Sequence, residues 1–407
     1  MFFTRQKPLL YIFGLLLSMA LLGLFFSKDV SVASFQETAV NAKVQNQSFY
    51  PPVSSEKKIR IGYLEGEKYV NFAGNFYAIL KGLEELGWLE DLQGLPYQEG
   101  QEDTSEMWNW LVTNQRSNYV QFVDNAHFSL LGAPYSADEA VHRLTETGDI
   151  DFIMAMGTVA GQLLAEKSHS IPTMVFSSSN AVQSGIIESA EDSGKDHVWA
   201  HMDIDRYSRQ IEVFHDIFEF STLGMLYEDS DVGRVYAAVD DVQFLAEERG
   251  FKITHMYVDE AKSGLDRQER YYPEVLAAFT KLAQEVEAMY ITVGTWELDY
   301  FTELLAPFYE NNVPVFSQLG SEEVAYGALM SVARQDFLEA GLFFAENIGE
   351  VFNGKLPRHL PQIYTHVPTI AINLEAAKRI EYQVPFEILL VADEIILATE
   401  GEGSRNE

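Results

Sequence analysis

The feature that most constrains the fold is a regular alternation of short apolar strands with amphipathic helices. From residue 136 onward, apolar runs recur, and a helical stripe with a glycine or polar stop separates one run from the next. The predicted strands span residues 151–156, 172–176, 223–227, 251–258, 288–293 and 313–317. This β-α-β-α order is typical of parallel sheets that carry helices on both faces. The predicted fold class is therefore α/β.

The alternation falls into two series, the first ending near residue 180 and the second beginning near residue 203. A strand at 58–63 and a helix at 76–86 open the first series. Because 407 residues are enough for two domains with separate cores, the two series predict two Rossmann-like lobes with parallel sheets. Residues 93–135 interrupt the first series, and Trp108 within them could line a ligand cleft. Buried packing under an insertion is the favoured role for that indole.

The segment 313–337 returns the chain from the second lobe to the first. Its strand, 313–317, is followed by a Gly/Ser/Glu turn and a second apolar run at 328–332. Asp336 then caps a predicted helix that ends near Phe352. A return of this kind indicates several crossovers between the lobes.

Three crossovers would form a hinge, and a hinge between two lobes favours capture of a small ligand by closure. We place the crossovers near residues 177–183, near Gln318 and near residues 365–368. The predicted domains are residues 1–33 as signal peptide or membrane anchor, 34–57 as linker, 58–180 with 318–366 as lobe I, 181–317 with 367–398 as lobe II, and 399–407 as a polar tail.

The first residues favour export of the protein. Arg5 and Lys7 precede the apolar run 9–26, and residues 31–33 (Ser-Val-Ala) offer a small-residue cleavage site. The run is also close to the lower limit for a membrane span, so an uncleaved anchor is the alternative to a cleaved signal. In either case the body of the protein is expected outside the cytoplasm, in the periplasm or an equivalent space.

Composition and motifs exclude several classes of function. The net charge of -33 excludes nucleic acid as a partner, and membrane contact is expected only through the N-terminal segment. The absence of cysteine removes disulfides, thiolate catalysis and Cys-ligated metals. The chain has no G-x-S-x-G, H-E-x-x-H or P-loop motif, so no enzymatic activity and no cofactor are predicted. His197 and His201 have a metal-like spacing only on a helix, and their segment is predicted to be a strand, so no metal is expected.

Five stretches in order resemble one protein family. They read IPTMVFSSSN (171–180), LGMLYEDSD (223–231), AMYITVGTWELDYF (288–301), the return segment (311–337) and NGKLPRHLPQIY to IAINLEAAKRI (353–380). The chain resembles the solute-binding proteins of ABC transporters with the type I periplasmic-binding fold, in the branch that includes aromatic amino-acid binders. The likeness extends over residues 58–396 and is weakest across 93–135.

The resemblance implies ligand contacts from loops of both lobes. The implied residues are Tyr63, Glu65, Gly157, Thr158, Ser177, Ser178, Tyr227, Asp229, Thr295, Trp296 and Gln318. Backbone N–H groups at Gly157 and Thr158 would suit an anion, although Thr158 could equally be a helix N-cap. Trp296 and Asp229 replace the smaller residues of the family and suit a cationic or flat ring-bearing ligand.

The sequence therefore predicts an extracytoplasmic solute-binding protein. It would close on a small aromatic or nitrogenous ligand and deliver it to an ABC permease and its ATPase. The alternative is a sensor that uses the same lobes but is held to the membrane by residues 9–26.

Overall fold

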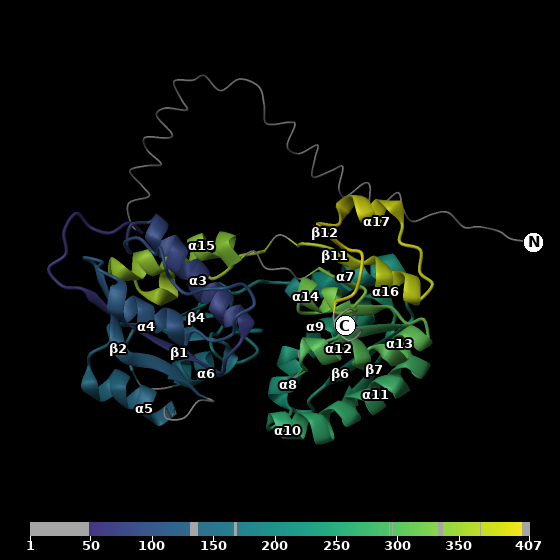
Figure 1. Ribbon diagram of the computed structural model, residues 1–407. Coiled ribbons are helices and arrows are strands. Elements are labelled where there is room, and N and C mark those ends of the chain that lie inside the picture. Colours follow the sequence, from purple (N-terminus) through teal and green to yellow (C-terminus); the bar gives the residue numbers. More distant parts are fainter. Residues whose placement is uncertain are drawn as a thin grey trace, which may run out of the picture. The chain divides into compact units, whose positions relative to one another are not determined.

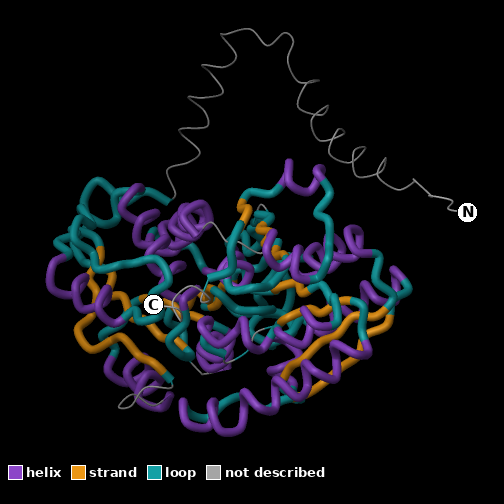
Figure 2. The backbone as a smooth tube through the Cα atoms, turned by 45° about the vertical axis from the view of Figure 1, so that its right-hand side comes forward, coloured by secondary structure: helices purple, strands orange, loops and turns teal. Residues whose placement is uncertain are grey.

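The computed structural model describes residues 49–130, 137–166, 169–292, 294, 296–332, 337–366 and 368–400 (Figure 1). The described part of the chain is α/β, as predicted, with two sheets among helices and loops (Figure 2). The predicted export segment 1–33, Thr295 and Asp336 lie outside the described residues. None of the described helices has the length and hydropathy of a membrane-spanning segment.

The first sheet is fully parallel, with the strand order β2-β1-β3-β4-β5. Its strands are β1 (Ile59–Glu65), β2 (Val120–Ser129), β3 (Phe152–Met156), β4 (Thr173–Phe176) and β5 (Val198–Ala200). Every residue of β3 and β4 is buried, which explains their continuous apolar sequences. Trp108 is 1% exposed and belongs to the core of this lobe, so the packing prediction for its indole is confirmed.

Helices from distant parts of the sequence cover the first sheet. They are α3 (Val70–Glu85), α4 (Ser105–Asn114), α5 (Ala137–His142) with the π-turn Arg143–Thr147, α6 (Thr158–Glu166) and α15 (Phe337–Phe352). Helix α15 lies beside α3 (Figure 1), and their backbones approach so closely that a β-carbon on Gly341 would be 2.4 Å from the Ala78 carbonyl oxygen. The return segment thus ends in the first lobe, as predicted.

The second sheet has the strand order β12-β11-β10-β9-β8-β6-β7, and only the β10–β11 pair is antiparallel. Its strands are β6 (Thr222–Tyr227), β7 (Lys252–Tyr257), β8 (Ala288–Ile291), β9 (Val315–Ser317), β10 (Met330–Ser331), β11 (Ala371–Asn373) and β12 (Glu394–Ile396). The first five of these strands, read as β7-β6-β8-β9-β10, repeat the winding of the first sheet. In such open sheets, ligands bind beyond the carboxyl ends of the strands near the point where the strand order reverses.

Helices pack on both faces of the second sheet. They are α7 (Arg206–Phe218), α8 (Asp231–Tyr236), α9 (Val239–Arg249), α10 (Gly264–Asp266) with the π-turn Arg267–Tyr271, α11 (Tyr272–Glu285), α12 (Leu298–Leu304), α13 (Ala306–Glu310), α14 (Ser321–Ala325), α16 (Leu374–Arg379) and α17 (Phe386–Val391). Helix α17 has an apolar sequence, yet its Phe386 and Leu390 side chains are 68% and 67% exposed.

Two of the predicted crossovers are wrong in position. Residues 181–197, assigned to the second lobe, lead to β5, which pairs with β4 in the first sheet. The chain leaves that sheet only at residues 201–205. After β9 the chain does not cross at Gln318. Helix α14 leads instead to β10, which pairs with β9 in the same sheet, and the Leu329 amide donates to the Val315 carbonyl. The short polar turn after β9 therefore stays within the second lobe.

The first crossover, at residues 201–205, lies beside the segment that leads into the third, which was predicted near residues 365–368. Met202 and Ile363 form a parallel bridge. The Met202 amide donates to the Gln362 carbonyl, and the Tyr364 amide donates to the Met202 carbonyl. The two segments, residues 201–205 and 362–366, therefore form a short ribbon between the sheets, which we call the hinge ribbon.

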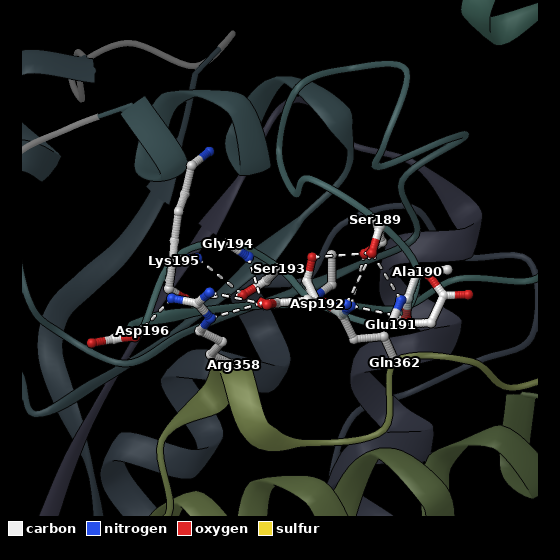
Figure 3. A network of polar contacts seen from close by, with 11 residues as sticks. Ser189, Ala190, Glu191, Asp192, Ser193, Gly194, Lys195, Asp196, Arg358 and Gln362 are labelled. Carbon is white, nitrogen blue, oxygen red and sulfur yellow. Dashed lines mark hydrogen bonds and ion pairs between the residues drawn. The ribbon is translucent and has the colours of Figure 1, made fainter.

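A polar network ties the base of this ribbon to the first lobe (Figure 3). The Arg358 guanidinium contacts both carboxylate oxygens of Asp192 at 2.7 and 2.9 Å and reaches Asp196 at 3.3 Å. The Gln362 amide donates to two carbonyls of the same loop, those of Ser189 and Ala190. The loop that precedes β5 is thus fixed to the third crossover.

Candidate functional site

The first-lobe residues singled out from the sequence lie at one edge of the first sheet. Glu65 ends β1, Gly157 and Thr158 follow β3, and Ser177 and Ser178 follow β4. These three strands are parallel neighbours, so their carboxyl ends share an edge.

The second-lobe residues are placed in the same way on the second sheet. Tyr227 ends β6, and Asp229 follows it; Trp296 lies between β8 and α12, and Gln318 directly follows β9. Both groups therefore occupy the edge where ligands bind in sheets of this winding.

A cavity of about 160 Å³ lies where the first lobe, the hinge ribbon and the start of the second lobe meet. Its lining residues are Asn75, Ser177, Ser178, Ser179, Asn180, His201, Met202, Asp203, Ile204, Asp205, Arg206, Tyr207, Asp241 and His366. Ser177 and Ser178 are the residues of the predicted set that line it. The cavity touches both the first and the third crossover, so a molecule bound there would contact segments that join the two lobes.

The first-lobe wall of the cavity carries neutral hydrogen-bonding groups. Ser177 has a left-handed backbone (φ 55°), and the Asn75 amide donates to its hydroxyl at 2.7 Å. The Ser178 hydroxyl oxygen is buried and has no hydrogen-bond partner among the described residues. Groups of this kind are available to a polar ligand.

The hinge wall combines a neutral imidazole with a paired carboxylate. Burial, and then the nearby His366, lower the pKa of His201 to about 4, so its ring is uncharged at neutral pH. A ring nitrogen of His201 lies 3.2 Å from the Tyr364 carbonyl oxygen. Asp203 is paired with Arg209 at 2.9 Å.

Most of the residues that line the cavity were not predicted from the sequence. Asn75 was recognisable from the sequence as a polar amide within the apolar stripe of α3, and it is only 5% exposed in the structure. Asp205 directly precedes α7, where an aspartate is typical of a helix cap, yet it has φ 62° and makes no side-chain capping bond. Asp241 lies on α9 and gave no signal of a cavity.

Gly157 and Thr158 form a tight junction next to this wall. Gly157 has φ 88°, and a β-carbon there would lie 2.4 Å from the Phe72 ring, so glycine is required. Thr158 is the first residue of α6, and its hydroxyl accepts a hydrogen bond from the Ser179 amide at 3.3 Å. The Thr158 side chain also lies close enough to the Tyr236 hydroxyl of α8 to affect the pKa of that hydroxyl, which burial raises above its ordinary value.

Tyr63 and Glu65 belong to a buried cluster rather than to the cavity wall. Tyr63 is fully buried, and its ring stacks on His127 with centroids 4.9 Å apart. The Tyr63 and Thr104 hydroxyls both donate to Oε2 of Glu65, at 2.9 and 2.8 Å. Oε1 of Glu65 has no partner among the described residues. Burial raises the pKa of this carboxyl to about 7.

A second buried carboxyl, that of Glu323, accepts hydrogen bonds from two side chains at the edge of the second sheet. Oε1 of Glu323 accepts from the Trp296 indole N–H at 2.8 Å, and Oε2 accepts from the Ser317 hydroxyl. Burial raises the pKa of Glu323 to about 7. Trp296 is therefore held against its own lobe by a specific hydrogen bond.

Two of the three remaining second-lobe candidates, Tyr227 and Gln318, also have partners within that lobe. The Tyr227 hydroxyl lies 3.0 Å from Nδ1 of His255, and Asp229 is exposed. The Gln318 amide donates to the Tyr236 carbonyl at 2.9 Å. None of these side chains lines the cavity described above.

The structure offers no metal-binding cluster among the residues it describes. His201 points to the hinge ribbon, while the ring of His197 lies 5.0 Å from that of His169. The strand β5 between His197 and His201 is the strand that the sequence predicted.

Comparisons with known proteins give one family and several similar folds. A family model described as ABC transporter substrate binding protein matches residues 124–396. No curated protein sequence matches the chain.

Three similar solved structures share the fold at low sequence identity. An ABC domain in complex with L-Trp from Streptococcus pneumonia has a TM-score of 0.61 at 18% identity and covers 84% of this chain and 100% of that one. A conserved domain protein from Vibrio cholerae has a TM-score of 0.61 at 17% identity, with 83% and 100% coverage. A substrate-binding protein with adhesive properties from Clostridium difficile, in a ligand-free, open structure, has a TM-score of 0.58 at 17% identity, with 84% and 99% coverage.

Proposed function

This chain belongs to the family of ABC transporter substrate-binding proteins, and we propose that it captures one small solute at its hinge cavity and delivers it to a membrane permease. The partners in this proposal are the solute, an ABC permease and the ATPase of that permease. The protein works outside the cytoplasm and carries out no chemical step on its ligand.

The observation that carries the proposal is the position of the cavity. Its lining comes from the loop after β4, from both adjacent crossovers and from α7 and α9 of the second lobe. A solute that contacts all of these segments binds one arrangement of the lobes better than others, and so shifts the protein toward that arrangement. A permease can then distinguish the loaded protein from the empty one.

The proposed ligand is a small aromatic or nitrogenous molecule. The structure from Streptococcus pneumonia contains L-Trp, and amino acids are therefore the first class to test. The cavity is lined by hydroxyls, amides, imidazoles and carboxylates, with Tyr207 as an aromatic surface. Such a lining suits a polar molecule that carries nitrogen.

We also propose the division of the chain that fits this role. Residues 1–33 direct the protein out of the cytoplasm, and residues 34–57 lead to the first lobe. Thr158, Tyr236 and Trp296, which lie at the two sheet edges, shape the rim of the ligand site.

A thermal-shift screen of amino acids, nucleobases and amines tests the proposal. A ligand that binds only the folded protein at a hundred times its Kd stabilises it by about 2.7 kcal/mol, which a melting curve resolves. We expect one chemical class to raise the melting temperature in a saturable manner. If no compound of these classes did so, the carrier function would be refuted.

A further inference from the structure

We propose that a second copy of this chain docks on the C-terminal border of the second lobe, and that the two copies pair along strand β12. The border is formed by exposed apolar side chains of α17, of β12 and of the residue after β12. These are Phe386, Leu390, Val391, Ile395 and Leu397, which we call the C-terminal patch. Such a dimer goes beyond solute capture, because it involves no lining residue of the hinge cavity.

Helix α17 is apolar but contributes no side chain to a core. Five of its six residues, in the sequence Phe-Glu-Ile-Leu-Leu-Val, are apolar, yet none of the six is buried. Helices of this length usually persist because an apolar face packs on the rest of the protein. Helix α17 lies beside β12 at the yellow end of the chain (Figure 1), so its exposed side chains and those of β12 form one border. An exposed apolar border of this kind is typical of a site that another surface covers.

Strand β12 offers a backbone edge for the pairing. It pairs with β11 on one side, and no strand of the described residues pairs with its other side. Edge strands are usually protected from other chains by lysine, proline or a bulge. The strand at the opposite edge of the second sheet, β7, begins with Lys252, whereas β12 contains neither lysine nor proline. The β12 edge is therefore the one that is open to another chain.

The exposed apolar area matches what a stable dimer needs. The five residues of the C-terminal patch together expose on the order of 500 Å², near the upper limit of the largest apolar patch on an ordinary monomer. A standard interface buries about 800 Å² on each partner. In homodimers about 65% of the buried area is apolar, which corresponds to about 500 Å². The patch can thus supply the apolar part of such an interface.

The charges beside the patch allow a two-fold pairing in one register. Strand β12 consists of Glu394, Ile395 and Ile396, so an antiparallel pair centred on Ile395 is the register that pairs all three residues. Glu394 then lies opposite Ile396 of the second copy, and no two carboxylates of the strands are directly opposed. Asp393, just before the strand, is held by its own lobe, since its carboxylate accepts from the Ile370 amide at 2.8 Å.

The remaining repulsion comes from the overall charge of -33 on each copy. This repulsion is long-ranged, and salt screens it. The same charge disfavours an anionic lipid surface as the occupant of the patch. A second copy therefore remains the occupant that fits the open strand edge, the apolar area and the register.

The absence of cysteine from the chain allows a direct test of the register. Residues opposite one another in an antiparallel pair have Cα atoms about 4.5 to 5.5 Å apart, a separation that a disulfide can span. The full chain with Ile395→Cys should therefore form a disulfide-linked dimer under mild oxidation with copper-phenanthroline, seen on a non-reducing gel. Leu265→Cys, at an exposed position on α10, is the control and should cross-link about tenfold more slowly or less.

Sedimentation equilibrium of the full chain measures the association itself. The variants are Leu390→Glu, within the patch, and Leu265→Glu, outside it, and both replace a leucine that is 67% exposed. We expect Leu390→Glu to weaken the dimer at least about tenfold, and Leu265→Glu to change its dissociation constant less than about threefold. Residues 1–33 are common to all variants, so association through them would not depend on Leu390. Melting curves check that both variants fold.

The dependence on salt is a second readout of the same association. Raising sodium chloride from about 50 mM to about 500 mM should tighten the wild-type dimer, because salt screens the repulsion between two acidic chains. An interface held mainly by ion pairs would weaken over the same range.

Three results would overturn the proposal. One is a wild-type chain that stays monomeric at about 100 µM in both salt concentrations. Another is equal association of Leu390→Glu and Leu265→Glu, and the third is equal cross-linking of the cysteines at positions 395 and 265. If the monomeric chain instead floated with phosphatidylcholine vesicles, and Leu390→Glu abolished this, a lipid surface rather than a second copy would cover the patch. The carrier function is tested separately, since solute binding at the hinge cavity involves none of these residues.

Discussion

The buried carboxyl of Glu65 gives the sharpest stability prediction. Glu65 is 1% exposed, and burial raises its pKa from 4.5 to about 7 in the folded protein. Between these two values the folded chain binds a proton that the unfolded chain has lost, so stability falls as the pH rises through this window. The full loss is about 3 kcal/mol above pH 7, and about 2 to 3 kcal/mol of it develops between pH 5 and pH 8.

The substitution Glu65→Gln removes this pH dependence with little change of shape. The glutamine oxygen can still accept from the Tyr63 and Thr104 hydroxyls, which both donate to one carboxyl oxygen. Its amide nitrogen takes the place of Oε1, which has no partner among the described residues. Relative to wild type, the variant should therefore gain about 2 to 3 kcal/mol of stability from pH 5 to pH 8.

Urea unfolding followed by tryptophan fluorescence is the appropriate assay. Four of the five tryptophans, at positions 88, 108, 110 and 199, belong to the core of the first lobe or pack against it, so the signal follows the lobe that contains Glu65. Glu106→Gln, which removes an exposed carboxyl from α4, is the control and should not reproduce the trend. A free-energy difference between Glu65→Gln and wild type that is the same at both pH values would refute the reasoning.

Three further predictions concern packing, a buried donor and the hinge base. Gly341→Ala should lower stability by about 1 to 3 kcal/mol in urea unfolding, because its β-carbon would lie 2.4 Å from the Ala78 carbonyl; an unchanged midpoint would contradict the helix contact. Trp296→Phe removes the indole N–H that donates to Glu323 and should lower the free energy of unfolding by about 1 to 3 kcal/mol. The loss should be larger at pH 8 than at pH 5, because the Glu323 carboxyl is protonated at pH 5, and equal losses at the two pH values would contradict this prediction. Arg358→Ala should speed proteolytic cleavage within residues 189–196, mapped by mass spectrometry, and unchanged cleavage there would show that the network of Figure 3 does not hold this loop.

The strands of both sheets could be predicted because their sequences satisfy a local rule. Buried parallel strands are continuous apolar runs, and β3, β4 and β8 are buried at every position. The alternation with helices then fixes the class of sheet. The predicted strand and helix after the return segment, at 313–317 and up to Phe352, appear as β9 and α15 for the same reason.

The crossovers could not be placed because they depend on which strands pair. Residues 181–197 contain turns and a short strand, and nothing local states that β5 joins β4 rather than the second sheet. Likewise, β10 is two residues long and is recognisable only by its pairing with β9 and β11.

The candidate site was predicted at the level of sheet edges but not of individual contacts. Strand ends indicate which loops converge, and they located Ser177 and Ser178 in the cavity wall. They do not report side-chain burial, so fully buried Tyr63 was expected to face a ligand. Asp241 and Asn75 lie on helices, where a single polar residue in the sequence does not indicate that its side chain faces a cavity.

The most direct test of ligand capture at the hinge is a calorimetric titration of the best-stabilising compound into wild type and Ser178→Trp. The indole would fill the cavity of about 160 Å³ from the first-lobe wall, where the Ser178 hydroxyl is buried. The account predicts one molecule bound per chain in the wild type and no measurable binding in a Ser178→Trp protein that still melts cooperatively. Binding of equal affinity in the two proteins would place the ligand elsewhere and contradict the account.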